Sequence, residues 1–127
     1  MAIYFTLKEM TNSSMAKAYQ IDNEPKEEFI IENLKKTMYI LDITRVYIGK
    51  PIYINSGYRC KKLNEIVGGV NNSMHTKGLA ADFRTLNRDH LDEIYDFLKK
   101  NKDKFQITEL IRYTNFIHMA VSQFLII

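Results

Sequence analysis

The stretch "NNSMHTKGLAADFR", residues 71–84, places one histidine, His75, seven positions before one aspartate, Asp82. The residues between them are mostly small, and "LAADFRT" (79–85) has the composition of a β-strand. We therefore expect His75 in a loop that enters a strand and Asp82 on that strand. The pair belongs either to a metal site or to an ordinary loop, and a third ligand elsewhere in the chain would decide between them.

The segments on both sides of this stretch predict a mixture of helices and strands. Pro25 begins a long helix in which apolar residues recur at spacings of three to five, and Gly49 ends it. The apolar residues of that pattern, which we expect on one buried face, are Phe29, Ile30, Leu34, Met38, Leu41 and Val46. The other expected elements are an extended segment at 4–10, a capped helical turn at 11–20, a strand at 51–55, a short helix within 56–69, a helix at 87–101, and strands at 107–113 and 116–127 joined at "TN". Their sum is an α+β fold, with helices packed on a small, mainly antiparallel β-sheet.

Composition limits the classes of protein that the chain can represent. With 127 residues, of which 46% are hydrophobic and 26% charged, we expect one domain over residues 1–127. The net charge of +3 is modest and the basic residues are scattered, so we expect no nucleic-acid partner. Cys60 is the only cysteine, which excludes an intrachain disulfide and a Cys-rich zinc module.

The N-terminal residues "MAIYFTLKEM" lack the positive region and the apolar core of a signal peptide. No apolar run approaches the roughly 18 residues of a membrane span. We therefore expect synthesis in the cytoplasm and no membrane insertion. Action outside the cytoplasm would then require another route of release. The expected oligomeric state is a monomer.

The third ligand candidate is His118, in the predicted strand "FIHMAV" (116–121). Together with His75 and Asp82 it makes a set of two nitrogens and one oxygen, which leaves the fourth tetrahedral position to water, as in catalytic zinc sites. The residue types alone do not decide the matter, because a histidine in a strand is usually a packed residue and an aspartate at a strand end is usually a cap or a surface charge.

The segment "SMHTKGLAAD" (73–82) resembles the Ser-x-His-x-x-Gly-x-Ala-x-Asp signature of the zinc D-Ala-D-Ala carboxypeptidases, the family of VanY- and VanX-like peptidases that includes phage L-alanyl-D-glutamate endolysins. Upstream, "INSGYRCKKLNEIVGG" (54–69) is similar to the family's "SGYR…LN…VGG" segment, and "FIHMAV" resembles its closing strand. The resemblance runs from about residue 5 to residue 122. The signature residues stand at matching offsets: Ser73, His75, Gly78, Ala80 and Asp82.

The resemblance implies a hedgehog/D-Ala-D-Ala-peptidase-like fold and a Zn²⁺ ion held by His75, Asp82 and His118. It also implies that Arg59, in "SGYR", binds a substrate carboxylate or a developing oxyanion, for which its planar fork of donors is suited. The alternative for Arg59 is a surface salt bridge or a clamp on a loop. Ser73 either binds substrate or holds its own loop as an ST-turn.

The chain departs from the family pattern at the general base. The family has an acid three residues before the last histidine ligand, and here that position is Asn115, which cannot accept a proton from the attacking water. If "TN" centres a hairpin, Ile111 lies opposite His118 and Glu109 opposite Ala120. Glu109 would then project toward the metal side and is a candidate base, with a plain exposed or ion-paired glutamate as the alternative. The family often has a polar residue where this chain has Ala120.

The resemblance therefore predicts a zinc metallopeptidase that hydrolyses a peptide bond in peptidoglycan stem peptides. Its type would be a D,D- or L,D-carboxypeptidase or endopeptidase, including the phage endolysins. The alternative is a catalytically weak or inactive cell-wall-binding or virion structural module of the same fold, which Asn115 favours. The expected partner is a peptidoglycan stem peptide.

Overall fold

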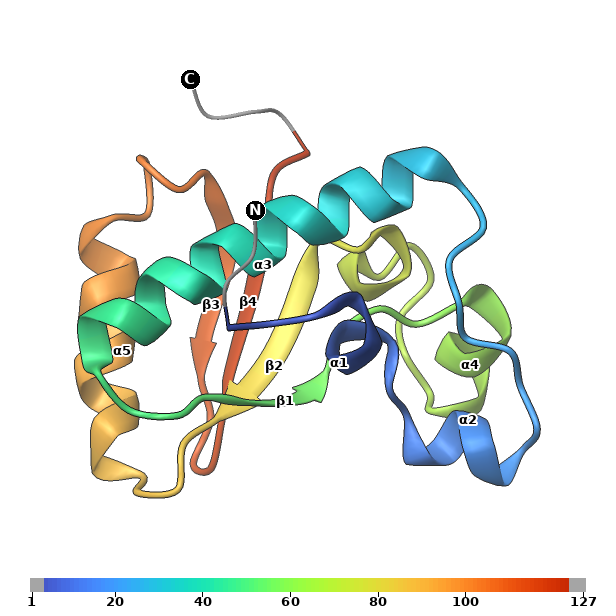
Figure 1. The fold of residues 1–127 in the computed structure, drawn as a ribbon, viewed down its shortest axis with the longest axis horizontal. Helices are drawn as coiled ribbons and strands as arrows, with labels where there is room; N and C mark the ends of the chain where they lie inside the picture. Colours follow the sequence, from blue (N-terminus) through green and yellow to red (C-terminus); the bar gives the residue numbers. More distant parts are fainter. Residues whose placement is uncertain (1–3, 124–127) are drawn as a thin grey trace.

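A computed structural model describes residues 4–123 and confirms the α+β fold class (Figure 1). The elements are α1 (Leu7–Thr11), α2 (Ser14–Ala18), α3 (Glu28–Ile48), β1 (Tyr53–Ser56), α4 (Lys61–Ile66), η1 (Met74–Lys77), β2 (Ala80–Arg84), α5 (Asp89–Lys100), β3 (Ile107–Arg112) and β4 (Ile117–Val121). Three short helices and one 3-10 turn, η1, lie at the end of the sheet where β1 ends and β2 begins, and two longer helices pack on the sheet (Figure 1).

The four strands form one sheet in the order β1-β2-β4-β3, and every neighbouring pair is antiparallel. The sheet places β2 and β4, which carry two of the expected metal ligands, side by side in its centre (Figure 1). The predicted hairpin register between β3 and β4 is confirmed, with Ile111 opposite His118 and Glu109 opposite Ala120.

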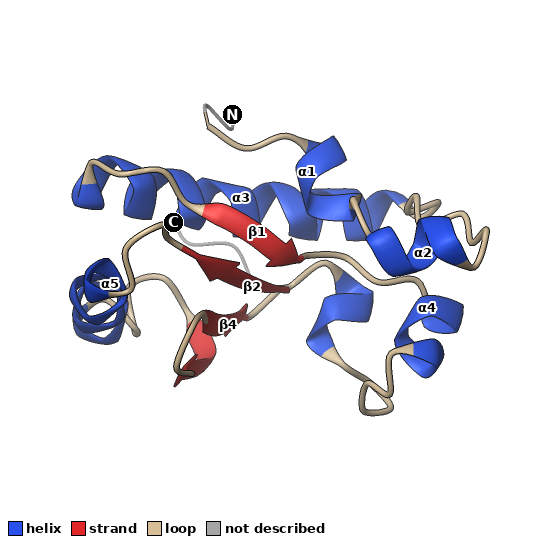
Figure 2. Cartoon of the chain, turned by 90° about the horizontal axis from the view of Figure 1, so that it is seen from below, coloured by secondary structure: helices blue, strands red, loops and turns tan. Residues whose placement is uncertain are grey.

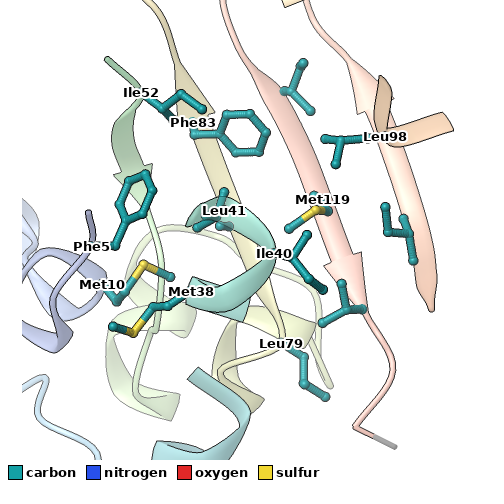
Figure 3. Packing of buried hydrophobic residues seen from close by; sticks show 14 of the residues in the cluster. Phe5, Met10, Met38, Ile40, Leu41, Ile52, Leu79, Phe83, Leu98 and Met119 are labelled. Atoms are coloured by element: carbon teal, nitrogen blue, oxygen red, sulfur yellow. The ribbon is translucent and has the colours of Figure 1, made fainter. Parts of the chain in front are cut away.

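One face of the sheet is covered by the two long helices, and Figure 2 shows α3 lying along it. The core side chains of α3 and α5 meet those of alternate strand residues in one hydrophobic cluster (Figure 3). Because side chains alternate along a strand, the residues between these core positions point to the opposite face. The fully buried members of the cluster include Leu34, Leu41, Phe83, Leu91, Ile94, Leu98, Ile117 and Met119.

Some predicted elements differ from the structure. The extended segment expected at 4–10 is wrong in its second half, because the Thr6 side chain accepts a hydrogen bond from the Glu9 N–H and begins α1 at Leu7. The long helix is confirmed, but Phe29 and Val46 are exposed, so its buried face is narrower than the pattern predicted. The last strand ends at Val121, and the part of its expected range at 124–127 lies outside the described residues.

Over residues 4–123, the structure has no helix that is both long enough and apolar enough to cross a membrane.

Candidate metal centre and cleft

The open face of the sheet carries a row of four residues, one from each strand. Ser56 on β1 pairs with Asp82 on β2, Asp82 with His118 on β4, and His118 with Ile111 on β3. Directly opposed residues of antiparallel strands point to the same face, so the side chains of Asp82 and His118 lie next to each other. The next row contains Ala80, Ala120 and Glu109.

His75 comes from η1 and not from the sheet, and its neighbours in the chain hold it over the row. The Ser73 hydroxyl accepts a hydrogen bond from the His75 N–H, which caps η1. The His75 ring is almost fully buried, and its Nδ1 lies 2.7 Å from the Gly57 carbonyl oxygen, to which it can donate. The Arg59 N–H donates to the His75 carbonyl. The "SGYR" turn thus holds His75 from both sides and leaves Nε2 directed toward Asp82.

A buried asparagine, Asn23, holds the "SGYR" turn in place through hydrogen bonds of its side chain. Its side-chain amide donates to the carbonyls of Thr11 and Tyr58, and its Oδ1 accepts from the Cys60 N–H. These three bonds satisfy the amide in a site where it is only 7% exposed. Asn23 therefore fixes the turn that holds His75.

The donor atoms of His75, Asp82 and His118 converge on one point. One donor atom from each residue lies within 4.8 Å of the other two. Asp82 Oδ1 is 3.4 Å from His75 Nε2 and 2.7 Å from His118 Nδ1. Among the histidine, cysteine and acidic side chains of residues 4–123, these three lie close enough together to hold a metal ion. Two imidazole nitrogens and one carboxylate oxygen, with an open side toward the cleft, fit a catalytic zinc site.

The electrostatics of the three ligands are strongly coupled. Burial by itself raises the pKa of Asp82, but hydrogen bonds and charge from His118 and His75 outweigh it and lower that pKa to about 2. The hydrogen bond with Asp82 raises the pKa of His118, burial opposes the rise, and Glu109 adds to it. Asp82 is thus ionised at neutral pH, as a metal ligand must be.

A cleft opens over these ligands and has two halves that meet at Arg59 and Asp82. One half, of about 370 Å³, contains the three ligands, and its outer wall has the apolar side chains of Val70, Ile111, Tyr113 and Phe116. The other half is lined more by polar groups, among them Asn12, Ser13, Ser14, Asn55 and Ser56. A peptide bound across the three metal ligands would therefore meet an apolar surface on one side and a polar surface on the other.

Arg59 lies at the junction of the two halves. Burial lowers the pKa of its guanidinium, and the charge of Asp82 opposes that change. Its Nε is buried and has no hydrogen-bond partner among residues 4–123. A buried N–H donor without a hydrogen-bond partner costs free energy because it has lost its water. An anionic ligand in the cleft would supply the missing acceptor. The salt bridge that was an alternative role for Arg59 is not present among residues 4–123.

Ser73 lines the cleft next to His75, but its hydroxyl accepts from the His75 N–H. The structure therefore shows the ST-turn role. A substrate contact by Ser73 stays a prediction.

The two residues considered for the general base lie in different places. Glu109 lines the cleft, and its Oε1 is 2.7 Å from His118 Nε2. Asn115 lies in the turn between β3 and β4 and does not line this half of the cleft; its Oδ1 accepts a hydrogen bond from Arg88 Nη1. The structure thus brings Glu109 to the ligands and places Asn115 against the N-terminal end of α5.

Several site residues were not predicted from the sequence. Gly57 acts through its backbone carbonyl, and a backbone contact leaves no mark on residue type. Tyr113 and Phe116 stack with a centroid distance of 4.6 Å on the cleft wall, and their position flanking "TN" was the only signal for them. Val70 is an apolar residue at the rim of the cleft, where it is 72% exposed.

Comparison with known proteins agrees with the geometry. A family model described as Peptidase M15 matches residues 3–120, which include all three ligands and the whole cleft. The chain belongs to the peptidase M15 family. Peptidase M15 members are zinc peptidases, so the resemblance found in the sequence is confirmed at the level of this metallopeptidase family. None of the curated proteins compared with this M15 chain matches it.

Proposed function

We propose that this M15 chain is a zinc-dependent peptidase that hydrolyses a peptide bond in peptidoglycan stem peptides. The observation that carries the proposal is the convergence of His75, Asp82 and His118 in a cleft that also holds Arg59. The chemistry that zinc supplies when bound is Lewis acidity toward a carbonyl and a lowered pKa for water. The reaction is the attack of a water oxygen on the scissile carbonyl carbon, cleavage of the C–N bond, and transfer of a proton to the leaving amine.

The chain's own groups would orient the substrate for that attack. Arg59 lies where the two halves of the cleft meet and can offer paired N–H donors to a carboxylate or to the developing oxyanion. Stem peptides contain free carboxylates and short D-amino-acid side chains, which suit a cationic centre beside a small apolar wall. We propose a D,D- or L,D-carboxypeptidase or endopeptidase of the VanY or endolysin type, acting as a monomer at the cell wall after release or transport by a virion.

A second candidate function is a cell-wall-binding or virion structural module with weak or no hydrolysis. The observation that favours it is the absence of an acid at position 115, where the side chain is engaged with Arg88. In this case the cleft and its zinc would bind stem peptides without turnover.

Digestion of purified peptidoglycan by the zinc-loaded protein distinguishes the two functions. A peptidase releases fragments with new amino and carboxyl ends at one stem-peptide bond, which mass spectrometry identifies. Asp82→Asn is the matched control, since it keeps the size of the side chain and removes the anionic ligand. Cosedimentation with peptidoglycan, without any new chain ends, would support the binding module and overturn the peptidase proposal.

A further inference from the structure

We propose that Glu109 is a positioning residue, whose carboxylate holds the His118 ring so that Nδ1 faces the zinc site. The inference rests on the proposed zinc dependence. It assigns Glu109 a role that differs from the general base considered above, and the two roles have different measurable consequences.

The neighbours of the His118 ring indicate which of its two nitrogens faces the metal site. On the Nδ1 side lie Asp82 Oδ1 at 2.7 Å and, 3.4 Å from that oxygen, His75 Nε2. On the Nε2 side lies Glu109 Oε1 at 2.7 Å. The His75 ring uses its Nδ1 on the Gly57 carbonyl, so only its Nε2 is free to join a site. Three ligands therefore meet on the Nδ1 side, and the Nε2 side has one carboxylate.

With Nδ1 on the metal, the opposite nitrogen of His118, Nε2, has to carry the proton of the ring. A neutral imidazole that binds a metal through Nδ1 has its proton on Nε2. In His118 that proton would point at Glu109 Oε1, which lies 2.7 Å from Nε2 and can accept it. Histidine ligands usually donate their second N–H to a carboxylate or a carbonyl, which fixes the tautomer and the ring orientation and makes the metal-binding nitrogen more basic. His75 has a carbonyl in this role, and His118 has a carboxylate.

The hairpin of β3 and β4 brings Glu109 to this position. Glu109 stands opposite Ala120, and His118 lies two residues before Ala120 on the same strand face. A diagonal neighbour across two strands is within reach of a long side chain. Ala120 has only a methyl group and is fully buried, so it leaves the diagonal open for the glutamate. The register shifts between Ile107 and Glu109, which sets the side of the strand on which Glu109 projects.

Substitutions at Glu109 separate the positioning role from the base role. Glutamine keeps an oxygen that can accept the Nε2 proton but cannot serve as a base, whereas alanine removes both. For a positioning residue, Glu109→Ala should weaken zinc binding by about 10–100-fold, and Glu109→Gln should weaken it by less. For a base that does not support His118, both variants should bind zinc as tightly as the wild type while turnover falls by about 10²–10⁴-fold.

The experiment is a zinc titration against a chromophoric chelator, with each variant checked for folding by circular dichroism. Thr108→Ala is the control, because Thr108 is exposed on the same strand next to Glu109. It should leave zinc affinity unchanged. If Glu109→Ala does not fold, Glu109→Gln alone still decides the question through the second readout below.

The second readout is the ring itself, observed by ¹⁵N NMR of the zinc-loaded protein. The positioning role predicts a metal-bound Nδ1 and a protonated Nε2 in His118, with an Nε2 proton that exchanges slowly in the wild type and faster in Glu109→Gln. A proton on Nδ1 in the zinc-loaded protein, or unchanged zinc affinity in Glu109→Ala, would overturn the inference. Wild-type protein that binds no zinc at all would instead overturn the proposed function.

Discussion

Substitution of Gly57 by alanine is a direct test of how the fold supports the metal centre. An ideal Cβ at this position would lie 2.3 Å from the Met10 carbonyl oxygen and 3.0 Å from the Met10 carbonyl carbon. Both neighbours are backbone atoms, so they can move only with α1. The same Met10 oxygen accepts a 2.7 Å hydrogen bond from the Tyr58 N–H, which the movement would strain.

The substitution should lower both the stability of the fold and the affinity of the site for zinc. Overpacking of this kind costs typically about 1–3 kcal/mol, which for a chain of this length lowers the melting temperature by roughly 4–12 °C. The loss of zinc affinity arises because the Gly57 carbonyl accepts the His75 Nδ1 proton. Displacing that carbonyl should weaken zinc binding by about 10–100-fold.

Thermal denaturation with and without zinc, together with a chelator titration, measures both effects. Gly49→Ala is the control: its Cβ would meet nothing within 4 Å, but its φ of +66° is strained for alanine. This control should lose roughly 1–2 kcal/mol of stability and keep its zinc affinity. Wild-type zinc affinity in Gly57→Ala would refute the role of the Gly57 carbonyl, and wild-type stability would refute the contact with Met10.

Three further predictions concern the cleft and its electrostatics. Arg59→Lys keeps the charge but loses the paired donors, so turnover of peptidoglycan fragments should fall while the melting temperature stays the same; a variant with full turnover would contradict a substrate role. Asn115→Asp should pair with Arg88 on the surface, change stability by at most about 1 kcal/mol, and raise turnover little; a large gain in hydrolysis assays would show that position 115 supplies the base. In protein stripped of metal, the hydrogen bond with Asp82 raises the pKa of His118. Protonated His118 therefore stabilises the fold below about pH 6.5, and this stability is lost as the pH rises through the raised pKa. Melting temperature should therefore fall over that range in the stripped wild type and not in His118→Gln.

Sequence patterns predicted the parts of the fold that depend on periodicity and on local turns. The spacing of Ile30, Leu34, Met38 and Leu41 predicted α3, and all four are buried. The two residues "TN" were enough to set the register of the last hairpin. The segment at 4–10 was wrong because α1 is only five residues long, too short for a helical period, and its signal is the single cap at Thr6.

The candidate ligands were predictable from their motif, but the contacts that hold them were not. The acceptor for His75 is a backbone oxygen 18 residues away, and the acceptor of the proton on His118 Nε2 depends on how one side chain crosses a hairpin diagonal. The bond between Arg88 and Asn115 joins residues 27 positions apart. Such contacts follow from the packing of elements in three dimensions, which residue spacing does not encode.

Anomalous X-ray diffraction at the zinc edge, from crystals of the zinc-loaded protein, would locate the metal relative to His75, Asp82 and His118. We expect one strong anomalous peak bounded by His75 Nε2, the Asp82 carboxylate and His118 Nδ1. A peak on the Nε2 side of His118, or no peak near these three residues in crystals grown with zinc, would contradict this position of the metal.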